Sequence, residues 1–334
     1  MTHGKLWPAH PKPFYDELLS SWVVRVVNAN HIKLQTLTRM LFGESLSPWM
    51  RDIDRNPPFW LLDSFCKYTG VERRTALDAT LNVYRGRLFN DNRMSGHQKW
   101  LLTLSLVGTK RKAYGLQFCP LCLADDHVAY FRKQWRVALF TYCPVHKVEL
   151  YDACPSCKKP VMYYRGDFGR DIKGALPIAM CYACGYDFRG AEIKPICFPS
   201  ADLSEIYTNM LNSLIYPCST DKIFDFGFFS VMHQLCKVMG TRQNHGALLA
   251  YLSDRISLPI LAMPNGWVTI EERRRYERFI WLNCLLWLMD DLEKRLIEAW
   301  KAKAIRYNLM RRDFKDAPQW YCNISNKCEN WRNA

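Results

Sequence analysis

The sequence lacks any long hydrophobic run. Its longest apolar stretch extends from Phe279 to Met289 and is interrupted by Asn283, whereas a membrane-spanning helix needs about 20 consecutive apolar residues. The polar first residues do not resemble a targeting segment. We therefore expect a soluble, cytoplasmic protein that has no membrane partner.

The sequence also lacks the local signatures of common enzymes. It contains no GxxxxGK followed by Ser or Thr, no GxSxG and no HExxH, which removes the usual support for an ATPase, a serine hydrolase or a metalloprotease. The zinc deaminase pattern of H-x-E and a later P-C-x-x-C is missing as well. The acidic doublets Asp125-Asp126 and Asp290-Asp291 fit a solvated surface better than a two-metal nuclease. We expect no enzymatic activity.

Acidic residues are in the minority. The chain has 32 Asp and Glu against 46 Lys and Arg, which gives a formal net charge of +14. Such an excess favours polyanionic partners, and nucleic acid is the commonest of these. A hydrophobic content of 49% over 334 residues describes a folded chain with material for two or three domains.

The sequence does contain four metal-ligand pairs within 66 residues: Cys119-x2-Cys122, Cys143-x2-His146, Cys154-x2-Cys157 and Cys181-x2-Cys184. Two such pairs complete a tetrahedral zinc shell. The first and second pairs are 20 residues apart, and the third and fourth are 23 apart. We predict two consecutive structural zinc modules, the first with three cysteines and a histidine and the second with four cysteines. They would hold two Zn2+ ions and leave no open position for catalysis.

Two other arrangements of these ligands remain open. A disulfide framework belongs to short secreted domains, and a long chain with seven further scattered cysteines fits it poorly. In a cross-braced arrangement, the first and third pairs would share one metal.

The first hundred residues predict helices separated by turns. Apolar residues repeat at helical spacing over residues 17–29, with Asp16 as a cap, and over residues 34–42, where Gly43 ends the helix. A connection of about four residues makes this pair a candidate helix-turn-helix. Most such pairs are merely parts of a bundle, so both interpretations stay open.

A second helical pair follows the first. It extends from Pro58 to Lys67 and from Arg73 to Leu81, with Gly70 as a cap between the two helices.

The region after the cysteines again predicts helices. Prolines in residues 194–220 mark a linker, and shorter helices are expected at residues 203–215, 224–239 and 244–253. One long helix is expected from about Ile270 to Arg306, with Thr269 as its cap and Glu271 and Glu272 in its first turn.

These patterns predict a mainly α protein in which helical domains with a helix-turn-helix flank two consecutive zinc-ribbon or knuckle modules. The expected divisions are an N-terminal helical domain at 1–110, a double zinc-binding module at 111–192 and a C-terminal helical domain at 193–334.

Basic residues near these elements are candidate nucleic-acid contacts, although each of them fits a solvated face equally well. They are Lys33, Arg39, Arg73, Arg74, Lys110, Arg111, Lys112, Arg132, Lys133, Arg136, Arg273, Arg274 and Arg275. Aromatic and basic residues alternate over residues 130–136, a composition that can stack on and neutralise a strand. Small zinc modules also recruit aromatics to cover the metal, and we expect Trp135 to be core.

The sequence around the first two ligand pairs resembles the hallmark of the TniQ/TnsD family. The string that carries the resemblance is Phe118-Cys119-Pro120-Leu121-Cys122-Leu123-Ala124, Ala129-Tyr130-Phe131-Arg132, Trp135-Arg136, Tyr142-Cys143-Pro144-Val145-His146, Leu150 and Cys154-Pro155-Ser156-Cys157. Near the start, the opening helix of the family is matched by Pro13, Glu17-Leu18-Leu19-Ser20-Ser21-Trp22 and Arg25. The resemblance covers about residues 12–190 and is thinner beyond them.

This resemblance implies a role in DNA transposition. TniQ/TnsD proteins select target sites for Tn7-like and CRISPR-associated transposons, either by binding DNA or by docking to a CRISPR effector complex. They recruit an AAA+ ATPase regulator (TnsC/TniB-like), are not the transposase, and in some cases form a homodimer. A zinc-ribbon transcription regulator with no role in transposition is the alternative.

Overall fold

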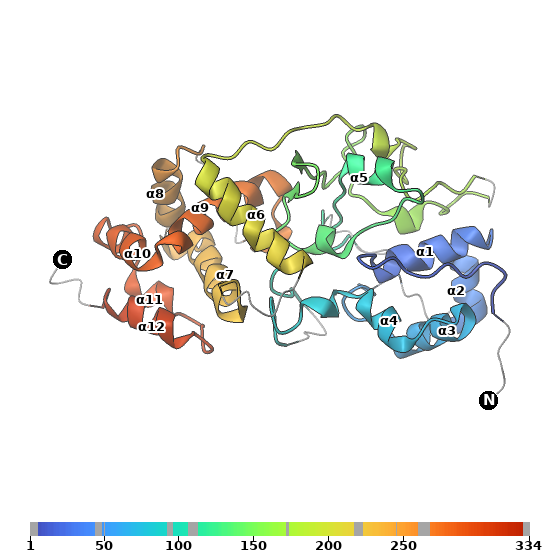
Figure 1. Cartoon of the computed structure of the whole chain (residues 1–334), viewed down its shortest axis with the longest axis horizontal. Coiled ribbons are helices and arrows are strands. Elements are labelled where there is room, and N and C mark those ends of the chain that lie inside the picture. The colour runs from blue at the N-terminus through green and yellow to red at the C-terminus, as the bar shows by residue number, and fades with distance from the viewer. Residues whose placement is uncertain are drawn as a thin grey trace. The chain divides into compact units, whose positions relative to one another are not determined.

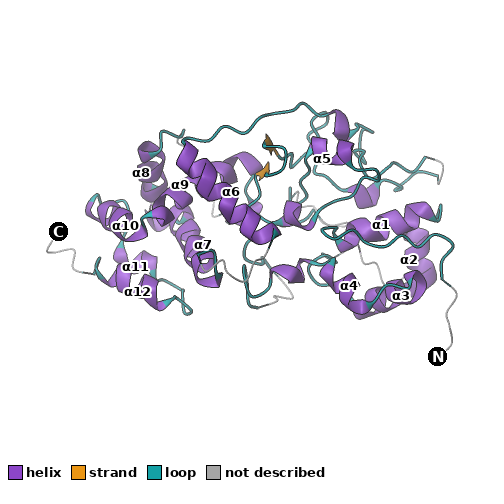
Figure 2. Cartoon of the chain, in the orientation of Figure 1, coloured by secondary structure: helices purple, strands orange, loops and turns teal. Residues whose placement is uncertain are grey.

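The computed structural model of the chain describes residues 6–43, 49, 51–91, 96–105, 113–171, 174–216, 223–244, 246–259 and 268–329. These residues are mainly helical (Figures 1 and 2), which confirms the predicted class. The chain divides into two compact units. The first comprises Met1–Arg85, Arg93–Gly96 and Leu101–Pro195, and the second comprises Gly86–Asn92, His97–Trp100 and Ile196–Ala334.

The first unit begins with four helices, α1 (Leu19–Ala29), α2 (Leu34–Phe42), α3 (Phe59–Thr69) and α4 (Arg73–Asp78). Helix α1 is buried almost all round, because its polar residues Ser20, Ser21 and Arg25 are buried together with its apolar ones. A surface helix would leave one face in water. Helix α1 is therefore the central element of this part of the chain.

The observed ends of these helices agree only in part with the ends predicted from the sequence. Gly43 and Gly70 end α2 and α3 with φ of 74° and 62°, as expected for residues that tolerate a left-handed conformation. Asp16 is not a cap: α1 begins after Leu18 with no side-chain cap, and the Asp16 carboxylate accepts from the Tyr130 hydroxyl instead.

The expected helix from Arg73 to Leu81 is also shorter than predicted. Helix α4 ends at Asp78, and the 3-10 turn η2 (Leu81–Tyr84) follows. The Thr80 side chain accepts from Asn82 N–H and so starts η2 as a separate element.

The metal-binding region of the first unit consists of short elements, among them α5 (Pro120–Asp125) and the 3-10 turns η3 (Lys133–Arg136), η4 (Tyr163–Arg165) and η5 (Phe188–Gly190). Strands β1 (Tyr142–Cys143) and β2 (Val148–Glu149) pair antiparallel, with Cys143 opposite Val148. Phe118 stacks on Tyr151 and Phe188, with ring centroids 5.5 and 4.4 Å away. This aromatic stack supplies much of the small core.

Backbone and side-chain hydrogen bonds join α1 to residues 130–136 of this region. Leu18 N–H donates to Phe131 O at 2.8 Å, and Phe131 N–H donates to the Ser21 hydroxyl at 2.9 Å. The fully buried Glu17 accepts from Ser21 at 2.8 Å and from Arg25 at 2.6 Å. The start of α1 and the first metal module are therefore held in one register.

Arg136 forms a second buried link in the first unit. Its guanidinium is 0% exposed and bonds to Asp52 at 2.6 Å and to Asp54 at 3.1 Å. The Asp54 carboxylate also accepts from the Ser20 backbone N–H at 2.7 Å. Burial raises the pKa of Asp54 to about 6, although Arg136 opposes this increase. Because the Arg136 guanidinium is fully buried, the loss of its carboxylate partners would leave an uncompensated charge and destabilise the fold.

The second unit is a set of helices, namely α6 (Ala201–Ile215), α7 (Phe226–Gly240), α8 (Ala247–Arg255), α9 (Arg275–Asp290), α10 (Leu292–Lys301), α11 (Tyr307–Met310) and α12 (Gln319–Asn326). Helix α9 is its core: residues 278–286 are all buried, and α9 contacts α6, α7, α8 and α10. No helix in the described part of the chain has both the length and the apolar composition to cross a membrane.

The prediction of a single long helix from Ile270 to Arg306 is wrong. Residues Ile270–Glu272 form the 3-10 turn η7, α9 starts at Arg275, and Asp291 interrupts the helix with φ of −134°. Thr269 makes no side-chain cap. Glu271 is 3% exposed and bonds to Trp100 N–H and to His233 Nε2, both at 2.8 Å. These long-range bonds hold Glu271 outside the helix.

The division into domains at 1–110, 111–192 and 193–334 stays a prediction, because compactness does not measure independent folding. The helix-turn-helix also stays a prediction, although α1 and α2 are joined by residues 30–33 as expected.

The Arg136 contacts predict a large effect on stability. Arg136→Gln leaves Asp52 and Asp54 without their cation, and we expect the free energy of unfolding to fall by about 3–5 kcal/mol. Arg39→Gln, at an exposed position of α2, is the matched control and should change it by less than about 0.5 kcal/mol. Urea denaturation measures both changes. Equal midpoints for the two variants would contradict the role of Arg136.

Candidate metal centres and nucleic-acid interface

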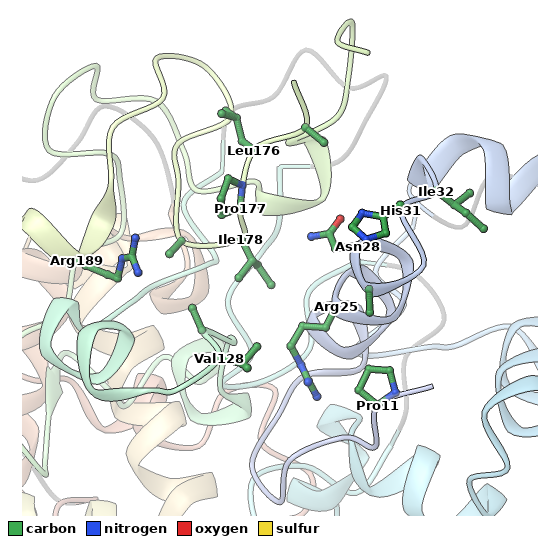
Figure 3. A pocket seen from close by; sticks show the side chains of 14 residues that line it. Pro11, Arg25, Asn28, His31, Ile32, Val128, Leu176, Pro177, Ile178 and Arg189 are labelled. Atoms are coloured by element: carbon green, nitrogen blue, oxygen red, sulfur yellow. The ribbon is translucent and has the colours of Figure 1, made fainter. Parts of the chain in front are cut away.

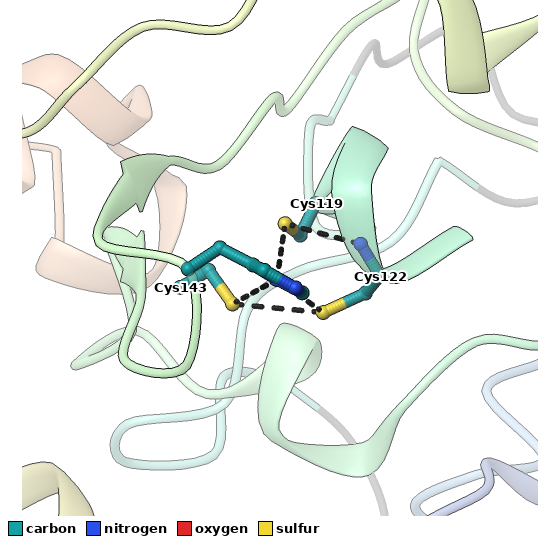
Figure 4. A group of neighbouring side chains, drawn as sticks. Cys119, Cys122 and Cys143 are labelled. Carbon is teal, nitrogen blue, oxygen red and sulfur yellow. Dashed lines mark hydrogen bonds between the residues drawn. The ribbon is translucent and has the colours of Figure 1, made fainter. Parts of the chain in front are cut away.

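The first metal centre lies between α5 and the β1–β2 hairpin. Cys119 precedes α5, Pro120 occupies its first position and Cys122 follows within the first turn, where its N–H points to Cys119 Sγ at 3.5 Å. Cys143 ends β1, and His146 lies in the turn before β2. Figure 4 shows the sulfur atoms of the three cysteines gathered around a common centre.

The distances in this centre fit a tetrahedral ion. With Zn–S bonds of about 2.3 Å, two thiolates at tetrahedral positions are about 3.8 Å apart. Cys122 Sγ and Cys143 Sγ are 3.6 Å apart. His146 Nδ1 lies 3.6 Å from Cys119 Sγ, 3.3 Å from Cys122 Sγ and 3.5 Å from Cys143 Sγ. Four atoms of the expected types thus lie near the corners of one tetrahedron.

The second centre is formed by the remaining two pairs. Cys154 Sγ is 3.7 Å from Cys184 Sγ, and Cys157 Sγ is 3.6 Å from Cys181 Sγ. Within each centre all four ligand atoms lie within 4.8 Å of one another. Sequential pairing is therefore confirmed, and the described cysteines are free rather than joined by disulfides.

Three of the four ligand pairs lie in the same kind of turn. The residue after the second ligand has a positive φ, and its N–H donates to the carbonyl of the first ligand. These residues are Lys147 (φ 55°, 2.8 Å to Cys143 O), Lys158 (φ 60°, 3.0 Å to Cys154 O) and Gly185 (φ 73°, 2.9 Å to Cys181 O). A local turn thus directs two side chains towards one point, which is why the spacing alone predicted the ligands.

Both centres have four protein ligands, and thiolate and imidazole are the ligands that Zn2+ prefers in structural sites. Each cluster has the ligand set and the spacing of a structural zinc ion. The predicted pair of structural Zn2+ ions is therefore supported by the geometry of this chain.

Asp125 positions His146 from outside the first centre. Its carboxylate lies 2.9 Å from His146 Nε2, so the other ring nitrogen, Nδ1, faces the three thiolates. Such a carboxylate fixes the tautomer and the orientation of a ligating histidine. Asp125 is exposed, as predicted for a solvated surface, whereas Asp126 is half-buried and its carboxylate accepts two bonds from Arg132, at 3.0 and 2.7 Å.

The three predicted basic contacts of the first module are largely buried and have partners inside the protein. Arg136 is fully buried, Lys133 is 9% exposed, and the Lys133 ammonium donates to Tyr15 O at 2.9 Å. Arg132 is 12% exposed, is paired with Asp126 and lies 5.0 Å from the centre of the Trp135 ring. The alternation of aromatic and basic residues therefore builds the interior of the module. Trp135 is core, as expected.

The predicted basic entry of α9 is also corrected in part. Arg273 is 4% exposed, and its guanidinium lies 3.9 Å from the centre of the Trp281 ring. Burial lowers the pKa of Arg273, against the effect of Glu277. Arg274 is exposed and Arg275 is half-buried, so these two remain candidates.

The other candidates differ in exposure. Arg39 and Arg74 are exposed, Lys33 is half-buried at the start of α2, and Arg73 is exposed but paired with Asp63. The predicted contacts Lys110, Arg111 and Lys112 lie outside the described residues.

An open groove of about 580 Å³ also lies in the first unit. In Figure 3, Arg189 lies on the side opposite the α1 residues Arg25 and Asn28, and Pro177 and Ile178 lie between them. Arg25 and Arg189 each bond to a carboxylate at 2.6 Å. The surface that lines the groove is therefore more apolar than charged.

The metal centres predict the effect of removing one ligand. Cys143→Ser and Cys154→Ser should each lower the zinc content from two ions to one per chain and abolish a cooperative melt, because metal binding and folding are coupled. Cys197→Ser, exposed and outside both centres, is the control and should keep both ions. Elemental analysis and thermal unfolding measure these changes. Full zinc with a cooperative melt in either ligand variant would refute the assignment.

The Asp125–His146 contact predicts a selective change in metal affinity. Asp125→Ala should weaken zinc binding at the first centre by about 10- to 100-fold and leave the second centre unchanged. Competition with a chromophoric chelator resolves the two ions. Asp202→Ala, at an exposed position of α6, is the control. An equal shift of both ions would show that Asp125 acts on overall stability instead.

Comparison with known proteins agrees with this geometry. The TniQ family model matches residues 8–150, somewhat less than half of the chain, and includes the first metal centre. The second centre begins at Cys154 and lies beyond the matched segment. No curated protein sequence matches the chain. Over residues 8–150, the chain is thus confirmed as similar to the TniQ family, as its sequence predicted.

Proposed function

We propose that this protein selects target sites for DNA transposition and that it acts as an adaptor rather than as an enzyme. The TniQ match over residues 8–150 carries this proposal. In this role the protein binds double-stranded target DNA and recruits an AAA+ ATPase regulator of the TnsC/TniB type, which passes the site to the transposase. A CRISPR effector complex and a second copy of the chain are further partners that the family resemblance implies.

The contacts within the first unit support a DNA-binding role for α2. Helix α1 is fixed by buried hydrogen bonds to the first metal module, and α2 follows it after residues 30–33. Gln35, Thr36 and Arg39 of α2 are exposed. In a helix-turn-helix, the second helix enters the major groove, and its exposed side chains contact base edges.

Exposed arginines outside α2 suit contacts to the phosphate backbone. Arg74 is exposed on α4, and guanidinium groups bind phosphate oxygens strongly. Phosphate contacts set the position of a protein on a duplex, whereas base contacts set its sequence preference. We therefore assign base recognition to Arg39 and phosphate binding to Arg74.

A selection from random duplexes at two salt concentrations tests this proposal. We expect a sequence motif that persists at the higher salt. Arg39→Gln should lower the preference for that motif, with a loss of about 1–3 kcal/mol at one position. Arg74→Gln should weaken binding to all duplexes and reduce the salt slope by about one unit. Lys301→Gln, at an exposed position of α10, is the control for charge alone.

A selection that recovers no sequence motif would contradict the proposal. Binding that is only salt-sensitive, with no motif, would overturn base recognition by α2. It would show that another component, such as a CRISPR effector, finds the site and that this protein bridges it to the ATPase.

A further inference from the structure

Neither the metal centres nor the contacts of α1 account for one group of side chains on the second metal module. The Arg165 guanidinium carbon lies 4.9 Å from the ring centre of Phe168 and 5.2 Å from that of Tyr182. We call Arg165, Phe168 and Tyr182 the aromatic–arginine cluster. Tyr182 lies between the ligands Cys181 and Cys184, so the metal centre holds the backbone from which its ring extends.

Arg165 differs from the buried arginines of this unit. Arg25, Arg132 and Arg136 each pair with a carboxylate, whereas Arg165 pairs with none in the described part of the chain, and its Nε has no hydrogen-bond partner there. The nearest acid in sequence, Asp167, accepts from Leu34 N–H at 2.6 Å. The Arg165 guanidinium therefore lies near two rings and has no carboxylate partner among the described residues.

The cluster is accessible from outside. Phe168 is 50% exposed, and Arg165 and Tyr182 are half-buried. Gly169 follows with φ of 70° and open space around it, so no neighbouring group covers the turn at this point. A large aromatic side chain stabilises the fold little when half of it stays in water.

The surroundings of the cluster add positive charge and fix its place. Arg170 Nη2 donates to Tyr182 O at 3.3 Å, which brings a second guanidinium beside the rings. The bond from Leu34 to Asp167 holds this segment against the first turn of α2. The cluster therefore lies close to α2, the helix to which we assign DNA recognition.

We propose that the aromatic–arginine cluster binds an unpaired base of a single-stranded nucleic acid. Accessible aromatic rings provide faces on which a base stacks, and nearby arginines neutralise the adjoining phosphates. Bases in a duplex are already stacked on their neighbours, so only an unpaired base can reach the Phe168 ring. This inference does not depend on the proposed role in transposition.

Fluorescence anisotropy with labelled 12-nucleotide strands tests the proposal. The ligands are single-stranded DNA, RNA of the same sequence and the corresponding DNA duplex, measured with the zinc-loaded full chain. Phe168→Ala should weaken single-strand binding by about 5- to 100-fold and change duplex binding by less than about twofold. Arg165→Gln should reduce the single-strand salt slope by about 0.7.

Two further variants separate stacking from folding. Tyr216→Ala removes an aromatic ring that is 68% exposed in the second unit and should change nothing. Phe168→Trp keeps a stacking face and should retain single-strand binding. If it does, and if Phe168→Ala is folded, the loss in Phe168→Ala is due to the missing ring. Zinc content and the thermal melt of each variant verify its fold.

The results test whether the cluster binds a single strand and show whether that strand is RNA or DNA. A loss on RNA, on single-stranded DNA or on both supports the cluster and identifies which strand it takes. The proposal is overturned if the wild-type protein binds neither strand, if Phe168→Ala binds like the wild type, or if duplex binding falls equally. Since duplex selection is measured separately, its failure leaves this result unaffected.

Discussion

The buried hydrogen bonds between α1 and the first metal module are the constraint on which the first unit depends. Leu18 and Ser21 at the start of the helix bond to Phe131, and Ser21 also donates to the buried Glu17. Ser20 bonds to Asp54, which in turn pairs with Arg136 of the module. Each of these groups is costly to bury without a partner, so the helix and the module stabilise each other only in this one register. The residues that carry the family resemblance at 17–25 and 130–136 are largely the two sides of this interface.

The metal centres are what makes this interface possible. The segments around their ligands have little regular secondary structure, and turns of this size bury too little apolar surface to hold their own shape. Two tetrahedral centres add to the small core around Phe118 and Trp135 and fix the loops from which the buried contacts project. Loss of metal is therefore expected to reach α1 and α2, far along the sequence from the cysteines.

The proposed function relies on side chains that this internal network does not use. Arg132 and Arg136 pair with carboxylates inside the protein. Arg39 and Arg74 are exposed, and Arg165 lies near two rings with no carboxylate partner among the described residues. The two zinc ions contribute no open coordination position. In the proposed functions the ions would act on nucleic acid indirectly, through the placement of α2 and of the aromatic–arginine cluster.

The sequence by itself determined the metal ligands, because each pair sits in a local turn that needs only its own residues. It also determined α2 and α3 with their glycine ends, for which helical spacing and a positive φ are local properties. Only the tertiary structure decided which arginines are buried: Arg136 meets Asp54 across 82 residues, and no local pattern encodes that contact. In the same way, Glu271 is held by Trp100 and His233, and this long-range bonding replaced the first turn of a predicted continuous helix by the 3-10 turn η7.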